Sequence, residues 1–290
     1  MIYEEITKNK IKSALLILLF VAIVVALGFF FSYAFSFGIP GLILAIFIAL
    51  VISLIGYYSG DKIALSMSSA KPADKKNYAY YHNAVEGLAI AAGIPKPELY
   101  IIPSKAINAF ATGRDPKHSS IAVTEGALEK LSRTELEGVL AHEISHIKNY
   151  DIRIMMLTGV LIGIVVIISD FILRSWLWRG NDERKGNLGL ILLIIGIALA
   201  ILSPIIANLI NLAVSRRREY LADASGALLT RYPKGLADAL RKIKKDTYEI
   251  KTSSATAHLF ISNPFKGKSI SHLFSTHPPI EERIRRLDAM

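Results

Sequence analysis

The chain contains no cysteine among its 290 residues. Disulfide bridges are therefore excluded, and a metal ion could be bound only by His, Asp or Glu side chains. Charged residues are also scarce, at 20%, whereas hydrophobic residues make up 52% and the mean hydropathy is +0.40. These proportions are too apolar for an ordinary soluble domain, so we expect a membrane protein in contact with a lipid bilayer.

Charged residues are absent from the whole of residues 13–60. A helix needs about 20 apolar residues to cross a bilayer, so this stretch can cross twice. Gly38 and Pro40 interrupt it and predict a tight turn between spans near 14–35 and 41–59. A cleaved signal peptide is the alternative for the first span, but the apolar stretch is long for a signal core and a second one follows at once.

Two further apolar segments occur at 154–173 and 186–215. The second is free of charge, whereas the first contains Asp170, so a buried helix of the soluble part is its alternative. Four spans would leave both termini and nearly all the remaining polar sequence on one side of the membrane. We therefore predict two hairpins, at 1–60 and 154–215, and one domain formed by 61–153 and 216–290.

The net charge of +10 indicates the orientation of the chain. Basic residues flank the predicted spans on the side of this domain, at Lys8, Lys10, Lys12, Lys62, Arg153 and 216–218. The positive-inside rule then places the domain in the cytoplasm, at the inner or plasma membrane of the cell, although four basic residues in the loop 174–187 oppose this. No basic run alternates with aromatic residues, so we expect no nucleic-acid partner.

The predicted domain combines helices and strands. A helix is expected at 78–92, where Gly93 ends it. Short strands are expected at 98–102, 107–113 and 120–124, with a turn at 114–116 between the last two. The fold class is therefore α+β.

A further helix is predicted to begin at Ser132, because Ser132 and Glu135 have the spacing of a capping box. It contains the run His-Glu-Ile-Ser-His at 142–146. Residues four apart leave the same face of a helix, so His142 and His146 can bind one ion, with Glu143 beside it. This arrangement is typical of metal-assisted hydrolysis, in which a nearby carboxylate accepts a proton from water. The alternative is an exposed helix whose polar residues are only solvated.

A third metal ligand is offered by the segment that follows Arg216, where Glu219 and Asp223 lie one helical turn apart. Glu219 can bind the ion. Asp223 is our candidate for a hydrogen bond to the far nitrogen of a metal-bound histidine, which would fix the tautomer of that ring. Surface acids paired with the neighbouring arginines are the alternative.

Four motifs occur in this order along the chain, at 108–113, 141–146, 219–223 and 274–279. With the paired N-terminal spans, they resemble the heat-shock metalloproteases of the HtpX type, in the family that also contains the CAAX prenyl endopeptidase. The resemblance implies a multi-pass helical membrane protein whose zincin-like metallopeptidase domain is mainly helical and carries a small β-sheet.

The resemblance also implies roles for individual residues. One Zn²⁺ per chain would be bound by His142, His146 and Glu219, and Glu143 would be the general base. The strand Asn108, Ala109, Phe110 and Ala111 would pair with the backbone of the substrate. His277 would stabilise the oxyanion, although it is equally explained as a residue at a helix start before Pro278. Arg283 is assigned to the substrate-binding side, where it would pair with an active-site acid.

The resulting hypothesis is an ATP-independent endopeptidase that cuts misfolded or damaged membrane proteins on the cytoplasmic side, in quality control and the stress response. No nucleotide is expected, because Gly267-Lys268-Ser269 resembles a phosphate loop but Ser262 stands where its first glycine is required. A prenyl-protein endopeptidase is one alternative. A membrane scaffold with a structural zinc is another, but such sites normally have four protein ligands.

Overall fold

The structure is a computed structural model that describes residues 2–34, 38–160, 216–250, 252, 256–264 and 278–290. The second predicted hairpin, at 154–215, lies outside these residues except for its first turns, and His277 lies outside them entirely. The multi-pass topology, the division into hairpins and domain, and the role of His277 therefore stay predictions.

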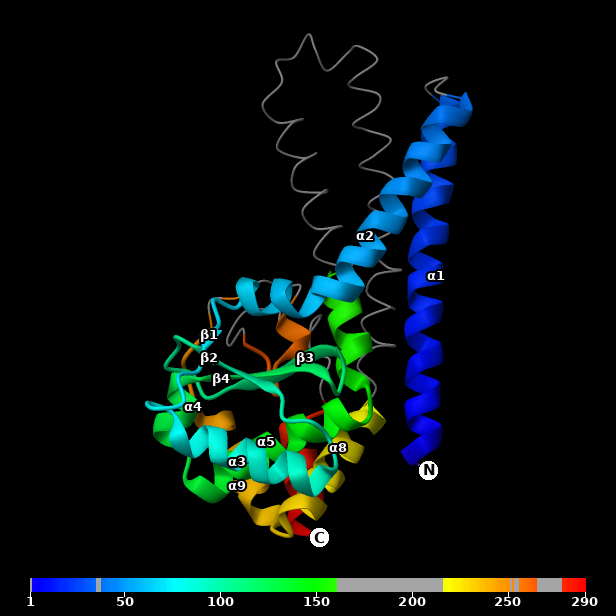
Figure 1. Ribbon diagram of the computed structural model, residues 1–290. Coiled ribbons are helices and arrows are strands. Elements are labelled where there is room, and N and C mark those ends of the chain that lie inside the picture. Colours follow the sequence, from blue (N-terminus) through cyan, green and yellow to red (C-terminus); the bar gives the residue numbers. More distant parts are fainter. Residues whose placement is uncertain (1, 35–37, 161–215, 251, 253–255, 265–277) are drawn as a thin grey trace.

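Two long helices begin the chain, α1 (Ile2–Ala34) and α2 (Gly38–Met67). They meet at the predicted break, where Gly38 has a φ of +59°, and they contact one another along the part of the molecule that extends from the rest (Figure 1). Both are longer than the predicted spans. Among the described helices α2 alone passes as a membrane span by length and composition.

A four-stranded mixed sheet lies below α2 (Figure 1). Its strands are β1 (Lys71–Pro72), β2 (Glu98–Ile102), β3 (Ala109–Asp115) and β4 (His118–Thr124), in the order β1-β2-β4-β3. The pair β2 and β4 is parallel, and the other pairs are antiparallel. The three predicted strands are confirmed with small shifts, whereas β1 was not predicted.

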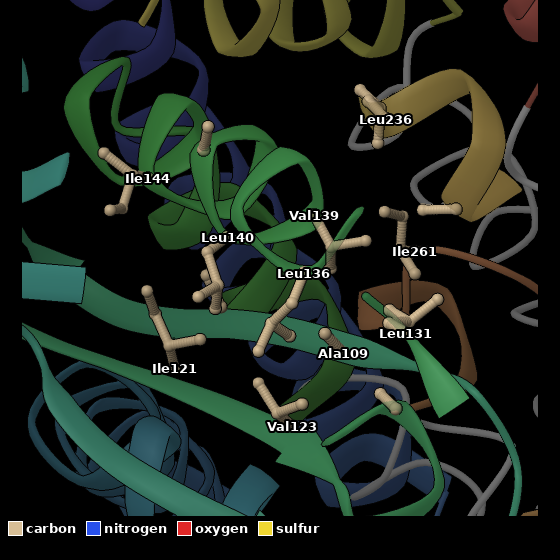
Figure 2. Packing of buried hydrophobic residues seen from close by; sticks show 14 of the residues in the cluster. Ala109, Ile121, Val123, Leu131, Leu136, Val139, Leu140, Ile144, Leu236 and Ile261 are labelled. Carbon is tan, nitrogen blue, oxygen red and sulfur yellow. The ribbon is translucent and has the colours of Figure 1, made fainter. Parts of the chain in front are cut away.

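Alternate residues of the strands face opposite sides of the sheet, as the period of two requires. Ile121 and Val123 belong to a core with the helices on one side, whereas Phe110 and Ala122 pack with Ala64 and Leu65 of α2 on the other. Figure 2 shows Leu136 and Leu140 of the central helix above Ile121 and Val123 of β4. Both faces of the sheet are therefore covered.

The helices that build the core come from both sides of the 161–215 segment. They are α3 (Ala79–Ala92), α4 (Glu125–Lys130), α5 (Arg133–Lys148), α8 (Arg216–Thr230), α9 (Pro233–Lys245) and α10 (Ile280–Asp288), with a 3₁₀ turn, η2 (Ala257–Leu259). Residues 151–160 are also helical. Gly93 ends α3 with a φ of +72°, and the capping box of Ser132 and Glu135 begins α5, as predicted.

Helix α5 lies at the centre of this core because two glycines allow its neighbours to approach closely. A Cβ atom at Gly138 would come within 2.6 Å of the backbone nitrogen of Leu236 in α9. A Cβ atom at Gly226 of α8 would lie 3.0 Å from the backbone nitrogen of His142. The second contact brings α8 against the His-Glu-Ile-Ser-His turn of α5.

Candidate active site

His142 and His146 leave the same face of α5 and are both buried. Their Nε2 atoms are 3.1 Å apart, and the two rings are nearly perpendicular. The i, i+4 spacing on a helix accounts for this arrangement. Two ring nitrogens are therefore directed to one point in the interior.

Glu219 of α8 supplies a carboxylate at the same point. Its oxygens lie 3.8 Å from Nε2 of His142 and 3.5 Å from Nε2 of His146. One ligand atom from each of the three residues lies within 4.8 Å of the others. Two ligands of a tetrahedral zinc ion are about 3.4 Å apart, given bonds of about 2.1 Å. The three side chains thus have the spacing of a zinc site.

Each histidine has a carboxylate on its other ring nitrogen. Asp223 Oδ1 lies 2.9 Å from Nδ1 of His142, which is the arrangement predicted for it. Asp151 Oδ2 lies 3.0 Å from Nδ1 of His146. Such bonds place the ring proton on Nδ1 and leave Nε2 available to a metal.

The contact of Asp151 was not predicted. The sequence shows an acid five residues after His146, where a continuous helix would turn it away from the ring. Instead α5 ends at Lys148, and Tyr150 has a φ of +61°, so the chain turns back before the helical residues 151–160 begin. The turn contains no glycine that would have predicted it, and it brings Asp151 within hydrogen-bonding distance of His146.

Arg283 of α10 lies in the interior of the site with 1% of its surface exposed. Its Nε and Nη2 donate to the two oxygens of Asp223 at 2.9 and 2.7 Å, and its Nη1 lies 3.6 Å from Glu219. A third bond goes to the carbonyl oxygen of Ile261, at 3.2 Å. Arg283 thus pairs with active-site acids, and its assignment to substrate binding stays a prediction.

The balance of buried charge favours a divalent cation. The ligand Glu219 and the groups around the ligand set together supply four buried carboxylates and two buried guanidinium groups in the described part of the chain: Glu143, Asp151, Glu219, Asp223, Arg218 and Arg283. With both histidines neutral and all four carboxylates ionised, the negative charges outnumber the positive charges by two. Because buried charge is costly unless it is compensated, a doubly charged ion at this point would balance the group.

The pKa values of the two histidines shift in opposite directions, because burial dominates at His142 and the neighbouring carboxylates dominate at His146. Burial lowers the pKa of His142 to about 4. Burial also opposes the charged form of His146, but the hydrogen bond with Asp151 and the charge of Glu219 outweigh it and raise the pKa to about 9. A metal ion bound to the two Nε2 atoms would take the place of the proton on His146.

Glu143 points from α5 into the same site and is buried. Burial raises its pKa to about 7, with the charge of His146 acting against this and that of Glu219 adding to it. The backbone N–H of Ala111 in β3 donates a hydrogen bond to its carboxylate. A carboxyl group of this pKa can accept and return a proton near neutral pH.

The predicted substrate strand lies at the edge of the sheet beside Glu143, because β3 is the last strand. The carbonyl oxygen of Ala109 accepts from the backbone nitrogen of Ile261 at 2.9 Å. The side chain of Asn108 donates to the carbonyl oxygen of Ser262 at 3.0 Å. Ala109 at the start of β3 and the preceding Asn108 are therefore in contact with another part of the chain, which was not predicted.

Phe110 lies on the face of the sheet opposite to Ala109 and Ala111. Its ring is buried, 5.0 Å from the ring of Phe260. Of the four residues assigned to the substrate strand, Ala111 is the one whose backbone contacts Glu143. The function of this strand stays a prediction.

Comparison with known proteins identifies the family. The sequence model of peptidase family M48 matches residues 75–290. A protease HtpX homolog of Caldanaerobacter subterraneus is 50% identical to this chain, over 100% of the chain and 98% of the relative. A second, of Thermoanaerobacter pseudethanolicus, is 49% identical over the same shares, and a third, of Lactobacillus helveticus, is 42% identical over 100% of both.

The fold is also similar to a solved structure. The crystal structure of S. mikatae Ste24p matches 99% of this chain and 67% of its own, with a TM-score of 0.52 and 19% sequence identity. At this identity the match supports the fold: a mostly helical chain with a small mixed sheet. The chain belongs to peptidase family M48 as an HtpX homolog, and it is a zinc metallopeptidase whose site contains His142, His146 and Glu219.

Proposed function

We propose that this protein is a membrane-anchored endopeptidase that cuts misfolded or damaged membrane proteins on the cytoplasmic side without ATP. The observation that carries the catalytic part is the position of Glu143. Its carboxylate is buried beside the ligands His142 and His146, takes no part in the ligand set, and contacts the edge strand through Ala111.

One zinc ion, when bound, would polarise the scissile carbonyl and make a water molecule more acidic. Glu143 would accept the proton of that water and later return it to the leaving amine. Asp223 and Asp151 would keep the two rings in the tautomer that ligates through Nε2, and Arg283 would hold Asp223 in place. His277 remains our candidate for stabilising the oxyanion.

The class of substrate follows from the edge strand and from the membrane helix. Addition of a peptide to the edge of a sheet uses backbone hydrogen bonds and needs no particular side chain, which suits an unfolded substrate. At Ala111 this edge lies next to Glu143. The apolar helix α2 ends against the opposite face of the same sheet, so the site would stand close to the bilayer.

The orientation and the independence of ATP rest on the sequence. Basic residues that flank the charge-free stretch of α1 and α2, such as Lys12 and Lys62, favour a cytoplasmic site by the positive-inside rule. The segment around Lys268 lacks the glycine pattern of a phosphate loop.

The test compares wild type with Glu143→Gln and with Glu137→Gln, all purified in detergent. Glu137 lies on the same helix and accepts a hydrogen bond from the hydroxyl group of Tyr80, away from the zinc ligands. We expect all three proteins to bind about one zinc and Glu143→Gln alone to lose activity, by about 10²- to 10⁴-fold. Equal cleavage by wild type and Glu143→Gln would refute the role of Glu143.

The substrate class is tested with the same wild-type protein in lipid vesicles. A misfolded membrane protein and an unfolded soluble protein are offered separately, each with and without ATP. We expect cleavage of the membrane protein at sites on the side that carries the catalytic residues, at a rate that ATP does not change. Cleavage that requires ATP, or that is confined to the soluble protein, would overturn this part of the proposal.

A further inference from the structure

We infer that Asn9, in the first helix of the chain, is a positioning residue for the zinc ligand His146 and acts through Asp151. This inference rests on the proposed zinc function and deepens it. It makes α1 a part of the metal site in addition to its place in the N-terminal helix pair.

The side chain of Asn9 is buried, with 1% of the residue exposed. Its amide nitrogen donates to Oδ1 of Asp151 and to the carbonyl oxygen of Asn149, both at 2.8 Å. An amide nitrogen carries two protons, so both of its donors are used. Both bonds link the start of the chain to residues about 140 positions later.

These bonds divide the carboxylate of Asp151 between two partners. Its Oδ2 lies 3.0 Å from Nδ1 of His146, while its Oδ1 accepts from Asn9. Arg218 also approaches Oδ1, but at 3.4 Å, where a hydrogen bond is weaker. Asn9 therefore makes the shorter of the two described contacts that fix the plane of the carboxylate and direct its other oxygen to His146.

Asn9 also spans the turn that carries Asp151. Tyr150, between Asn149 and Asp151, has a φ of +61°, a conformation that residues other than glycine seldom adopt. Surrounding contacts must hold such a residue in place. Asn9 donates hydrogen bonds to the residues on both sides of Tyr150, so α1 holds the two ends of the turn together. The neighbouring Lys10 also lies over the ring of Tyr150, with its ammonium nitrogen 4.7 Å from the ring centre.

The packing of α1 against the rest of the chain orients the side chain of Asn9 towards this turn. Asn9, Ser13 and Leu16 are spaced along one face of the helix and are all buried. Leu16 packs with Met156 and Leu157 of the helical segment that follows Asp151. Asn9 is outside this apolar cluster and contacts the turn through the two hydrogen bonds that its amide donates.

The effect of removing Asn9 can be placed relative to that of Asp151. Loss of a carboxylate that holds a ligating histidine weakens metal binding by about 10- to 100-fold. Asn9 is one hydrogen bond further from the metal than Asp151, and Arg218 also contacts Oδ1 of Asp151. We therefore expect removal of Asn9 to weaken zinc affinity by about 3- to 10-fold, less than removal of Asp151 itself.

The experiment uses the full chain in detergent and measures zinc affinity and the rate of zinc release by competition with a chelating dye. The variants are Asn9→Leu, Asn9→Gln, Asp151→Asn and the double variant Asn9→Leu/Asp151→Asn. Ser13→Ala is the matched control, because it removes a buried hydroxyl group from the same face of α1, where the hydroxyl bonds to the backbone of Asn9. The absorption spectrum of the cobalt-substituted protein reports the geometry of the ligands independently of activity.

We expect Asn9→Leu to release zinc faster and to alter the cobalt spectrum, Asn9→Gln to bind more tightly than Asn9→Leu, and Ser13→Ala to match wild type. In the Asp151→Asn background, Asn9→Leu should have little further effect, because its route to His146 is already lost.

The outcomes separate this inference from the proposed function. If wild type binds no zinc, the proposed function fails. If wild type binds zinc but Asn9→Leu and Asn9→Gln match it, or if the effects of Asn9→Leu and Asp151→Asn are additive, Asn9 does not act through Asp151 and the inference is overturned. Should Asn9→Leu fail to fold, the comparison of Asn9→Gln with Ser13→Ala decides by the same two measurements.

Discussion

Replacing Asp223 with asparagine tests the structure of the site with the smallest change of shape. The substitution exchanges one carboxylate oxygen for an amino group and removes the charge. In the wild type, one oxygen lies 2.9 Å from Nδ1 of His142, and both accept from Arg283, at 2.9 and 2.7 Å. The amide of the Asp223→Asn variant would retain one acceptor for these three contacts and would bring a donor against the guanidinium group.

The expected loss of zinc affinity follows from the position of Asp223, which is hydrogen-bonded to the zinc ligand His142. Loss of such a partner weakens metal binding by about 10- to 100-fold. This range corresponds to about 1.4 to 2.7 kcal/mol. Although burial opposes its charge, Arg283 holds the pKa of Asp223 at about 2, below the unfolded value of about 3.9. The contribution of the ionised carboxylate to the free energy of unfolding is therefore present above about pH 4 and is lost as the pH falls towards 2, whereas the Asp223→Asn variant lacks it at neutral pH as well.

The measurement is the zinc dissociation constant of full-length protein at neutral pH, obtained by competition with a chelator. Asp238→Asn is the matched control. The substitution removes the same charge, but Asp238 pairs with Arg241 on the partly exposed side of α9. The reasoning is refuted if Asp223→Asn binds zinc as tightly as wild type, or if Asp238→Asn weakens binding to the same extent.

Two further predictions concern the helices that carry the ligands. Gly226→Ala should lower stability by about 1 to 3 kcal/mol and weaken zinc binding, because a Cβ atom 3.0 Å from the nitrogen of His142 would force α8, and Glu219 with it, away from α5. Thermal unfolding and zinc titration check this against Gly87→Ala, where a Cβ atom meets nothing within 4 Å, and equal behaviour of the two would contradict it. Ser132→Ala should cost about 1 kcal/mol by removing the cap of α5, and the melting temperature should fall by about 2 to 4 °C without a change in zinc affinity. Thr134→Ala, in the first turn but outside the capping box, is its control, and a larger loss in that variant would exclude the cap as the cause.

Local patterns in the sequence were sufficient for the elements that depend on neighbouring residues alone. The capping box at Ser132 and the left-handed glycine at Gly93 define helix ends through bonds within a few residues, so both were predicted correctly. The strand at 98–102 was predicted with the bounds that it has in the structure. The spacing of His142 and His146 determines that they share a helix face, whatever the rest of the fold.

The strand β1, by contrast, has only two residues, Lys71 and Pro72, and no apolar pattern of its own. It exists because β2 offers an edge for pairing. Arg283 is likewise an ordinary basic residue of an amphipathic helix by its local pattern, and only the family resemblance linked it to an active-site acid. Only the packing of α10 against α8 and α9 turns it inward to meet Asp223, where burial makes the ion pair a part of the site.

The sequence by itself determined the chemistry of this protein: two histidines and a glutamate on one helical turn, a further acidic pair, and apolar segments long enough for a membrane. The tertiary structure decided how that chemistry is held. Asp151 reaches His146 because the chain turns at Tyr150, and Asn9 reaches Asp151 because α1 packs beside that turn. Such contacts depend on the path of the backbone and, for Asn9, on the packing of segments that are far apart in the chain, which no local pattern specifies.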